Sequence, residues 1–116
     1  MLPGLSIELD EPLAGVTELR VRGDVDLDGG KRLGRELEAA FAGGGPVLVN
    51  LCECSFMDSS GLSALIRAGR RNPDPRRFAV LCLREGDVRK VLALTRADTL
   101  LDVYEDRDAA LATVSG

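Results

Sequence analysis

Apolar residues recur with two different periods along this chain of 116 residues. Residues 47–51 and 78–83 are nearly continuous apolar runs, which is typical of strands that helices cover on both faces. Residues 62–69 instead carry apolar or small side chains at i, i+3, i+4 and i+7, the spacing of one helix face. Strands that alternate with helices need crossover connections, which favour a parallel sheet. The sequence therefore predicts one α/β domain, residues 1–116.

The N-terminal region is expected to form an antiparallel hairpin. Residues 5–9 alternate apolar and polar side chains, as does a strand with one buried face. Residues 16–21 favour a second strand, and Pro12 and Gly15 mark the turn between the two. A link this short joins antiparallel neighbours.

Helical and strand patterns alternate through the rest of the chain. Helices are expected at residues 33–41 and about 60–71, with Asp87 capping a third and Asp106 beginning a fourth. A short last strand is expected at residues 101–104. The order β-β-α-β-α-β-α-β-α describes a four- to five-stranded, mostly parallel sheet with an N-terminal antiparallel hairpin and about four helices.

Composition argues against several classes of protein. The net charge is −4 and the chain has three Phe, one Tyr and no Trp, which is a poor basis for a nucleic-acid site. No apolar stretch approaches a membrane span, and the first residues lack the features of a signal peptide. We therefore expect a cytoplasmic protein with neither a nucleic-acid nor a membrane partner. The absence of histidine and of familiar nucleophile or phosphate-loop motifs favours a binding module over an enzyme.

Metal binding finds weak support in the sequence. Asp24, Asp26 and Asp28 precede Gly29 as in the opening of a calcium loop, but the twelfth position is Arg35, where a bidentate glutamate belongs. We interpret this stretch as a strand end that leads into a helix start, where acidic side chains suit the helix dipole. The three cysteines, an odd number in apolar strands without histidine, indicate reduced and packed thiols rather than a zinc site: they are Cys52, Cys54 and Cys82.

The second predicted helix has one apolar face and one basic face. Leu65 and Ile66 are expected to pack against the sheet. A run of like charges usually forms a solvated surface, although it can also complement an acidic partner. The arginines of this helix and the following turn are Arg67, Arg70, Arg71, Arg76 and Arg77.

One carboxylate and two hydroxyl groups lie where this helix begins, in the stretch Asp58, Ser59, Ser60 and Gly61. A helix start offers unpaired backbone N–H groups and partial positive charge, which capping side chains or a phosphate can satisfy. A serine here is either a cap or an exposed hydroxyl that a kinase can reach. Ser60 lies nearer the helix and is the better candidate for a structural cap.

Three stretches resemble the STAS domain family, and within it the bacterial anti-sigma-factor antagonists. The most specific is the strand at residues 47–51 followed by Ser-Phe-Met-Asp-Ser-Ser-Gly-Leu at residues 55–62. Gly-Asp-Val-Asp at residues 23–26 is similar to the family's Gly-Glu-Leu-Asp, and residues 88–104 are similar to its third helix and last strand. The resemblance covers about residues 5–113 and implies a STAS-like fold.

The resemblance also implies a phosphorylation switch. In the family, the serine directly after the aspartate is phosphorylated by a partner that is both anti-sigma factor and serine kinase, and this serine corresponds to Ser59. The unphosphorylated form binds that partner and frees a sigma factor, and a separate serine phosphatase restores it. ATP belongs to the kinase, so no cofactor is expected here. The partner-binding residues expected from the resemblance are Asp24, Asp26, Asp58, Ser59, Ser60 and Gly61.

Two other functions stay open. One is a STAS adaptor subunit of a signalling or lipid-transport complex that works without phosphorylation. The other is a small-ligand-binding STAS module with its pocket at the start of the second helix.

Overall fold

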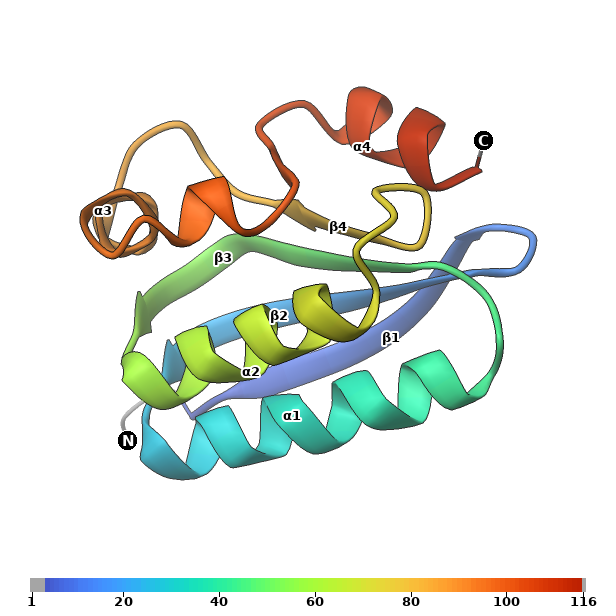
Figure 1. Ribbon diagram of the computed structural model, residues 1–116. Coiled ribbons are helices and arrows are strands. Elements are labelled where there is room, and N and C mark those ends of the chain that lie inside the picture. The colour runs from blue at the N-terminus through green and yellow to red at the C-terminus, as the bar shows by residue number, and fades with distance from the viewer. Residues whose placement is uncertain (1–3, 116) are drawn as a thin grey trace.

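Five strands lie side by side in the order β1-β2-β3-β4-β5 in the computed structural model, which describes residues 4–115 (Figure 1). β1 and β2 are antiparallel, and the other neighbouring pairs are parallel. The mostly parallel sheet with an N-terminal hairpin is therefore confirmed. The elements are β1 Ser6–Leu13, β2 Val16–Val25, α1 Leu27–Ala42, β3 Val47–Met57, α2 Ser59–Arg71, β4 Phe78–Leu81, α3 Asp87–Leu94, the 3-10 helix η1 Ala97–Thr99, β5 Val103–Tyr104 and α4 Arg107–Ser115.

Three helices cover one face of the sheet. Leu33 of α1, Leu65 of α2 and Leu92 of α3 share a buried core with Leu19 and Val49 of the central strands. Each of these side chains is fully buried, and burial of one Leu or Val stabilises the fold by about 1.5–3 kcal/mol. This apolar face fixes how α1 and α2 sit against β2 and β3.

Within the described part of the chain, the core on the opposite face contains side chains of α4 and of no other helix. Ala110 and Val114 of α4 pack on Leu48 of β3 and Leu81 of β4. Because successive side chains of a strand point to opposite faces, Leu48 serves this smaller core while Val49 serves the larger one. The sheet is thus covered on both faces at β3 and β4, as their near-continuous apolar runs predict.

Several element ends differ from the sequence-based expectation. β3 was expected at residues 47–51 but runs to Met57, because its ladder with β2 continues through Gly23 and Cys54 to Val25 and Met57. Register shifts interrupt this part of the ladder, so the alternation of apolar and polar residues that marks a strand is lost there.

Three further expectations need correction. Pro12 lies inside β1 rather than in the turn, and an edge strand tolerates it because proline lacks only the ladder N–H. The cap of α3 is Gly86, and Asp87 is the first helical residue. Ile66 is only partly buried at the margin of the core, whereas Leu65 is fully buried as expected.

The cysteines are free thiols. Cys82 is buried as expected, but Cys52 and Cys54 are only half-buried. Burial raises the pKa of Cys54 to about 11. All three thiols are therefore largely protonated near neutral pH, since burial also raises the pKa of Cys52 and of Cys82.

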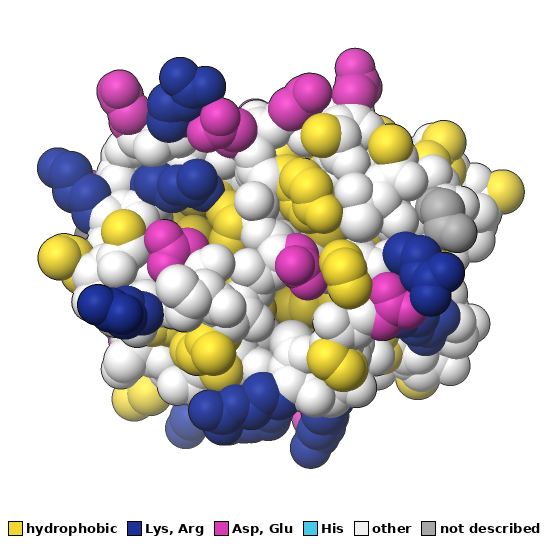
Figure 2. All heavy atoms as spheres, turned by 45° about the horizontal axis from the view of Figure 1, so that its top comes forward, with side chains coloured by type: hydrophobic (Ala, Val, Ile, Leu, Met, Phe, Trp, Pro, Cys, Tyr) yellow, Lys and Arg dark blue, Asp and Glu magenta, His cyan; other side chains and the backbone are white. Residues whose placement is uncertain are grey.

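The surface carries charges of both signs. On the face drawn in Figure 2, basic and acidic side chains are interspersed around small apolar areas. The arginines of the α2 region are exposed except Arg77, which is half-buried and donates to the Gly44 carbonyl oxygen at 3.0 Å. None of the described helices combines the length and apolar character that crossing a bilayer requires.

Candidate functional site

β2 and β3 end side by side, and each turns directly into a helix. Val25 is opposite Met57 in the parallel ladder, and the Asp58 N–H donates to the Val25 carbonyl oxygen at 3.0 Å. The next residue of each chain segment is an aspartate, Asp26 before α1 and Asp58 before α2. Two helix N-termini therefore lie together at the carboxyl end of the parallel strands (Figure 1).

Each aspartate caps its own helix. The Asp26 Oδ1 accepts from the Gly29 N–H at 2.8 Å, and the Asp58 Oδ1 accepts from the Ser60 N–H at 2.9 Å. The capping residue of α2 is thus Asp58, and the expectation that Ser60 caps this helix is wrong. The hydrogen bond from the Ser60 hydroxyl, with those from backbone N–H groups, holds the pKa of the Asp58 carboxyl below its usual range.

Ser60 instead joins the two helix starts. Its Oγ lies 2.5 Å from the Asp58 Oδ1, 3.2 Å from the Asp26 carbonyl oxygen and 3.4 Å from that of Leu27. Its single proton is donated to one of these acceptors at a time, and all three belong to the two caps and the first turn of α1. The half-buried hydroxyl therefore has a structural role.

Glycines let the two helices approach closely here. A Cβ on Gly30 of α1 would overlap the Ser60 Oγ and would lie 2.6 Å from the Gly61 nitrogen. A Cβ on Gly61 would lie 2.7 Å from Val25 Cγ1. Neither position has room for a side chain, so Gly30 allows α1 to pack closely on α2, and Gly61 allows the start of α2 to pack closely on the ends of β2 and β3.

Ser59 is the first residue of α2 and its side chain is exposed. Its neighbour Ser60 points back into the junction, whereas Ser59 faces solvent at the positive end of the helix dipole. The structure thus separates the two serines by environment: one hydroxyl is bonded within the fold and the other is open to a partner.

The other predicted partner-binding residues divide by accessibility. Asp24 and Asp26 are exposed, and Asp58 is half-buried. Gly61 is buried against Val25 and Met57, so it allows α2 to approach the strand ends closely and presents no side chain to a partner. The exposed carboxylates of Asp24 and Asp26 line a hollow with Arg32 and Arg35, so charges of both signs lie on the α1 side of the junction.

Two exposed apolar side chains near Ser59 were not identified from the sequence. Leu27, the first residue of α1, is 60% exposed, and Phe56, opposite Asp24 in the β2–β3 ladder, is 46% exposed. Large apolar groups at this exposure are typical of contact surfaces when they gather near one another. The only signal in the sequence was that each interrupts a polar stretch, Leu27 between two aspartates and Phe56 after Ser55.

The stretch from Asp24 to Gly29, which resembles the opening of a calcium loop, has a structural explanation. Asp26 is engaged as a cap, and Asp24 belongs to β2. Across residues 4–115, no three metal-ligating side chains come together in a way that holds an ion. The strand-end interpretation of this stretch agrees with its position between β2 and α1.

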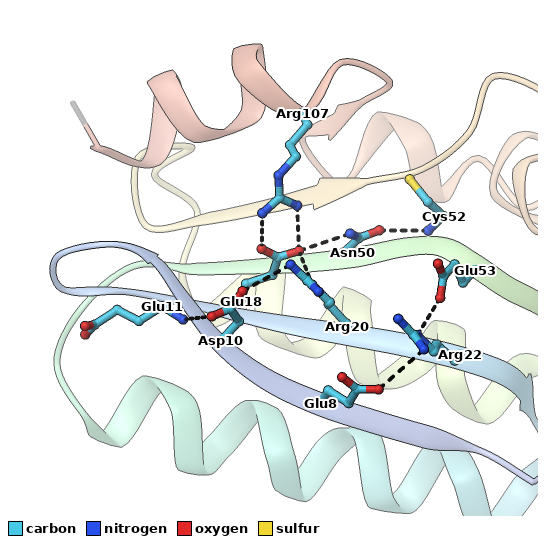
Figure 3. A network of polar contacts seen from close by, with 10 residues as sticks. All are labelled: Glu8, Asp10, Glu11, Glu18, Arg20, Arg22, Asn50, Cys52, Glu53 and Arg107. Carbon is cyan, nitrogen blue, oxygen red and sulfur yellow. Dashed lines mark hydrogen bonds and ion pairs between the residues drawn. The ribbon is translucent and has the colours of Figure 1, made fainter.

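A buried polar network occupies the sheet face that carries α4 (Figure 3). The Arg107 guanidinium of α4 donates two hydrogen bonds, of 2.7 and 2.5 Å, to the fully buried Glu18 carboxylate of β2. The Asn50 side chain donates a third, at 3.0 Å. Burial alone raises the pKa of Glu18, but these bonds and the charges of Arg107 and Arg20 outweigh it, so the pKa stays below its ordinary value. The network therefore fastens α4 to β2.

The family and the fold of this chain are both found among known proteins. Residues 11–102 match the model of the family described as "Mlab, STAS domain". The fold is similar to that of an anti-sigma factor antagonist from Mycobacterium paratuberculosis, with a TM-score of 0.86, 23% sequence identity, and coverage of 97% of this chain and 96% of that one. No curated protein sequence matches the chain.

The anti-sigma factor antagonist SpoIIAA is similar in two states. Its unphosphorylated form gives a TM-score of 0.67 at 19% identity, covering 96% of this chain and 99% of that one. The phosphorylated form of this Bacillus cell fate determinant gives 0.64 at 19% identity, covering 90% and 96%. The TM-scores show a shared fold, and the family match spans residues 11–102, most of the sequence. The chain belongs to the STAS-domain family.

Proposed function

We propose that this chain is an anti-sigma factor antagonist whose unphosphorylated form binds an anti-sigma factor with serine kinase activity and so frees a sigma factor. In this proposal the chain is a partner and a substrate of the kinase rather than an enzyme. Phosphorylation of Ser59 weakens the complex, and a serine phosphatase reverses the modification. The observation that carries the proposal is the exposed Ser59 hydroxyl beside a Ser60 hydroxyl that is bonded within the junction.

The geometry supports a switch that leaves the domain folded. A phosphate adds about −1.5 to −2 charge and three acceptor oxygens. On Ser59 it lies at the first residue of α2, where the N-terminal N–H groups and the helix dipole favour an anion. The effect of phosphorylation is therefore expected at the partner contact rather than in the core.

The surface around Ser59 explains why a partner would respond. Leu27 begins α1, and Phe56 and Asp24 lie at the paired strand ends that lead into the two helices, so a partner that covers this end of the sheet also covers Ser59. A phosphate in that contact adds bulk and a desolvation cost, and an unfavourable charge at an interface costs several kcal/mol. Each 1.4 kcal/mol is about a tenfold loss of affinity.

The test combines phosphorylation with binding. The purified chain is incubated with ATP and each candidate anti-sigma factor kinase from the same genome, and phosphate is mapped by mass spectrometry. We expect phosphate on Ser59, none in Ser59→Ala, and full partner affinity in Ser59→Ala. Ser59→Asp should stay folded and bind at least tenfold more weakly.

Ser63 provides the matched control, because it is exposed on the same helix one turn later. Ser63→Ala should be phosphorylated as the unchanged chain is, and Ser63→Asp should keep its partner affinity. Phosphate on Ser60 alone, or equal partner affinity of Ser59→Asp and Ser59→Ala, would overturn the switch.

A second candidate is an adaptor subunit of a larger assembly that binds through the same surface without phosphorylation. The exposed apolar pair Leu27 and Phe56 favours it, because a permanent contact needs apolar area more than a regulated one does. A stable complex that survives on the Ser59→Asp variant, with no kinase acting on the chain, would select this function.

A further inference from the structure

A hollow opens between α1 and α2 at the end of the helices away from Ser59. Its volume is about 330 Å³, within the size range of small-ligand pockets, about 300–1,000 Å³. Its floor is formed by one glycine and four apolar residues: Gly34, Leu37, Phe41, Ala64 and Ala68. Ala64, the lining residue of α2 nearest in sequence to Ser59, is five residues away, which is about 7.5 Å along the helix, and Ser59 does not line the hollow.

Small residues create this hollow. At the helix starts Gly30 touches the Ser60 and Gly61 backbone, but one turn later a Cβ on Gly34 would meet only the Ala64 Cβ, at 3.8 Å. The helices therefore leave space between them from Gly34 onward. Phe41 bounds the hollow on α1, and its ring is fixed edge-on against Phe78 at a centroid distance of 5.6 Å.

The rim of the hollow is basic. Arg67 and Arg71 lie one turn apart on α2 and both line it with exposed side chains. The acidic residue of the lining, Glu38, is 3.8 Å from Arg71, and both side chains are about two-thirds exposed, at 65% and 66%. An ion pair of this length and exposure is weak, so the rim keeps a positive charge in a chain whose net charge is −4.

We propose that this hollow binds a single-chain amphipathic anion, with the alkyl chain on the Leu37–Phe41 side and the anionic head group at Arg67 and Arg71. An apolar floor with a cationic rim matches such a molecule, since the tail leaves water and the head group keeps its charge paired. A fatty-acid carboxylate and an alkyl sulfate share this chemistry. The proposal does not depend on the phosphorylation of Ser59.

The test uses four probes that share a ten-carbon chain: decanoate, decyl sulfate, decanol and decyltrimethylammonium. Each is kept below the concentration at which it forms micelles or separates from water. Amide shifts of the ¹⁵N-labelled chain are followed by NMR. We expect saturable shifts at Gly34, Ala64 and Ala68 with decanoate, and the response to decyl sulfate shows whether a carboxylate is required. Decanol should bind more weakly and the cation should not bind.

Three variants localise the site. Arg67→Gln should weaken decanoate binding about two- to fivefold, the size expected for a partly exposed ion pair, whereas Arg70→Gln, an exposed arginine outside the hollow, should not. Gly34→Leu fills the hollow and should abolish binding while the chain stays folded, because leucine favours a helix interior over glycine. Binding retained by Gly34→Leu, equal binding of the cation, or no saturable shift with any probe would overturn the proposal.

Discussion

The Ser60 hydroxyl of α2 lies 3.2 Å from the carbonyl oxygen of Asp26, the residue that caps α1. One side chain thus ties together the starts of two helices that are far apart in sequence. Because the hydroxyl is half-buried and bonded, Ser60→Ala should lower the free energy of unfolding by about 1 kcal/mol. Ser59→Ala, at an exposed position, should change it by less than about 0.5 kcal/mol. Urea denaturation of both variants measures the difference, and equal stabilities would contradict the structural role of Ser60.

Two glycines of α1, one turn apart, should respond to alanine in opposite directions. A Cβ at Gly30 would lie 2.6 Å from the Gly61 backbone nitrogen, so Gly30→Ala should cost about 1–3 kcal/mol through overpacking. A Cβ at Gly34 meets only the Ala64 Cβ at ordinary contact, so Gly34→Ala should stabilise the chain by up to about 1 kcal/mol through helix propensity. In thermal melts, the melting temperature should therefore fall for Gly30→Ala and rise for Gly34→Ala. A change in the same direction for both variants would mean that α1 and α2 are not in contact as described.

The buried pair of Glu18 and Arg107 should dominate the attachment of α4. Arg107→Ala leaves the buried carboxylate without its main partner and should cost about 3 kcal/mol, the lower end for a broken buried pair because Arg107 is itself partly exposed. Arg84→Ala removes an exposed pair with Glu105 and should cost no more than about 1 kcal/mol. Similar losses of unfolding free energy in the two variants would mean that Glu18 is exposed to solvent rather than buried.

The Glu18–Arg107 pair also predicts how the stability of the chain changes in acid. The pKa of Glu18 in the folded chain lies below its ordinary value of 4.5, so its contribution to stability is complete above that value. The contribution is lost as the pH falls through the lower folded pKa. The stability difference between the unchanged chain and Arg107→Ala should therefore be constant near neutral pH and shrink in acid, as denaturation curves across this range can show.

Leu65 and Ile66 are neighbours on α2 but differ in burial. Leu65 is fully buried, so Leu65→Ala should cost about 2–5 kcal/mol. Ile66 is only partly buried, so Ile66→Ala leaves less of a cavity and should cost less than about 2 kcal/mol. Equal costs in chemical denaturation would mean that α2 is rotated about its axis relative to the structure.

The fold was predictable because its signals are local. The continuous apolar run of β4, the helix face around Leu65 and the short link at Gly15 each depend on a few adjacent residues. The second half of β3 was missed because register shifts with β2 remove its alternation. The cap at Asp58 was missed because three residues that can cap a helix, Asp-Ser-Ser, follow one another there, and only the geometry shows which one accepts from the helix N–H groups.

The polar network was beyond the reach of sequence patterns. Glu18 and Arg107 are 89 residues apart, and nothing near either residue indicates its partner. A charged residue at an inward position of β2 conflicts with the strand pattern, and only the tertiary contact resolves it. The exposure of Ser59 beside the bonded Ser60 likewise depends on α1, which the Asp-Ser-Ser motif does not contain.

This long separation also has a consequence for how the chain is made. β2 is translated early, when its carboxylate Glu18 has only Arg20 of the same strand as a charged partner, and the two hydrogen bonds from Arg107 become available only 89 residues later. A nascent chain that has formed the β1–β2 hairpin should leave Glu18 in water until then, because burying a charge without its main hydrogen-bond partner is costly. The sheet face under α4 is therefore expected to close last, and ribosome-bound chains shorter than this point should expose it to chaperones and proteases.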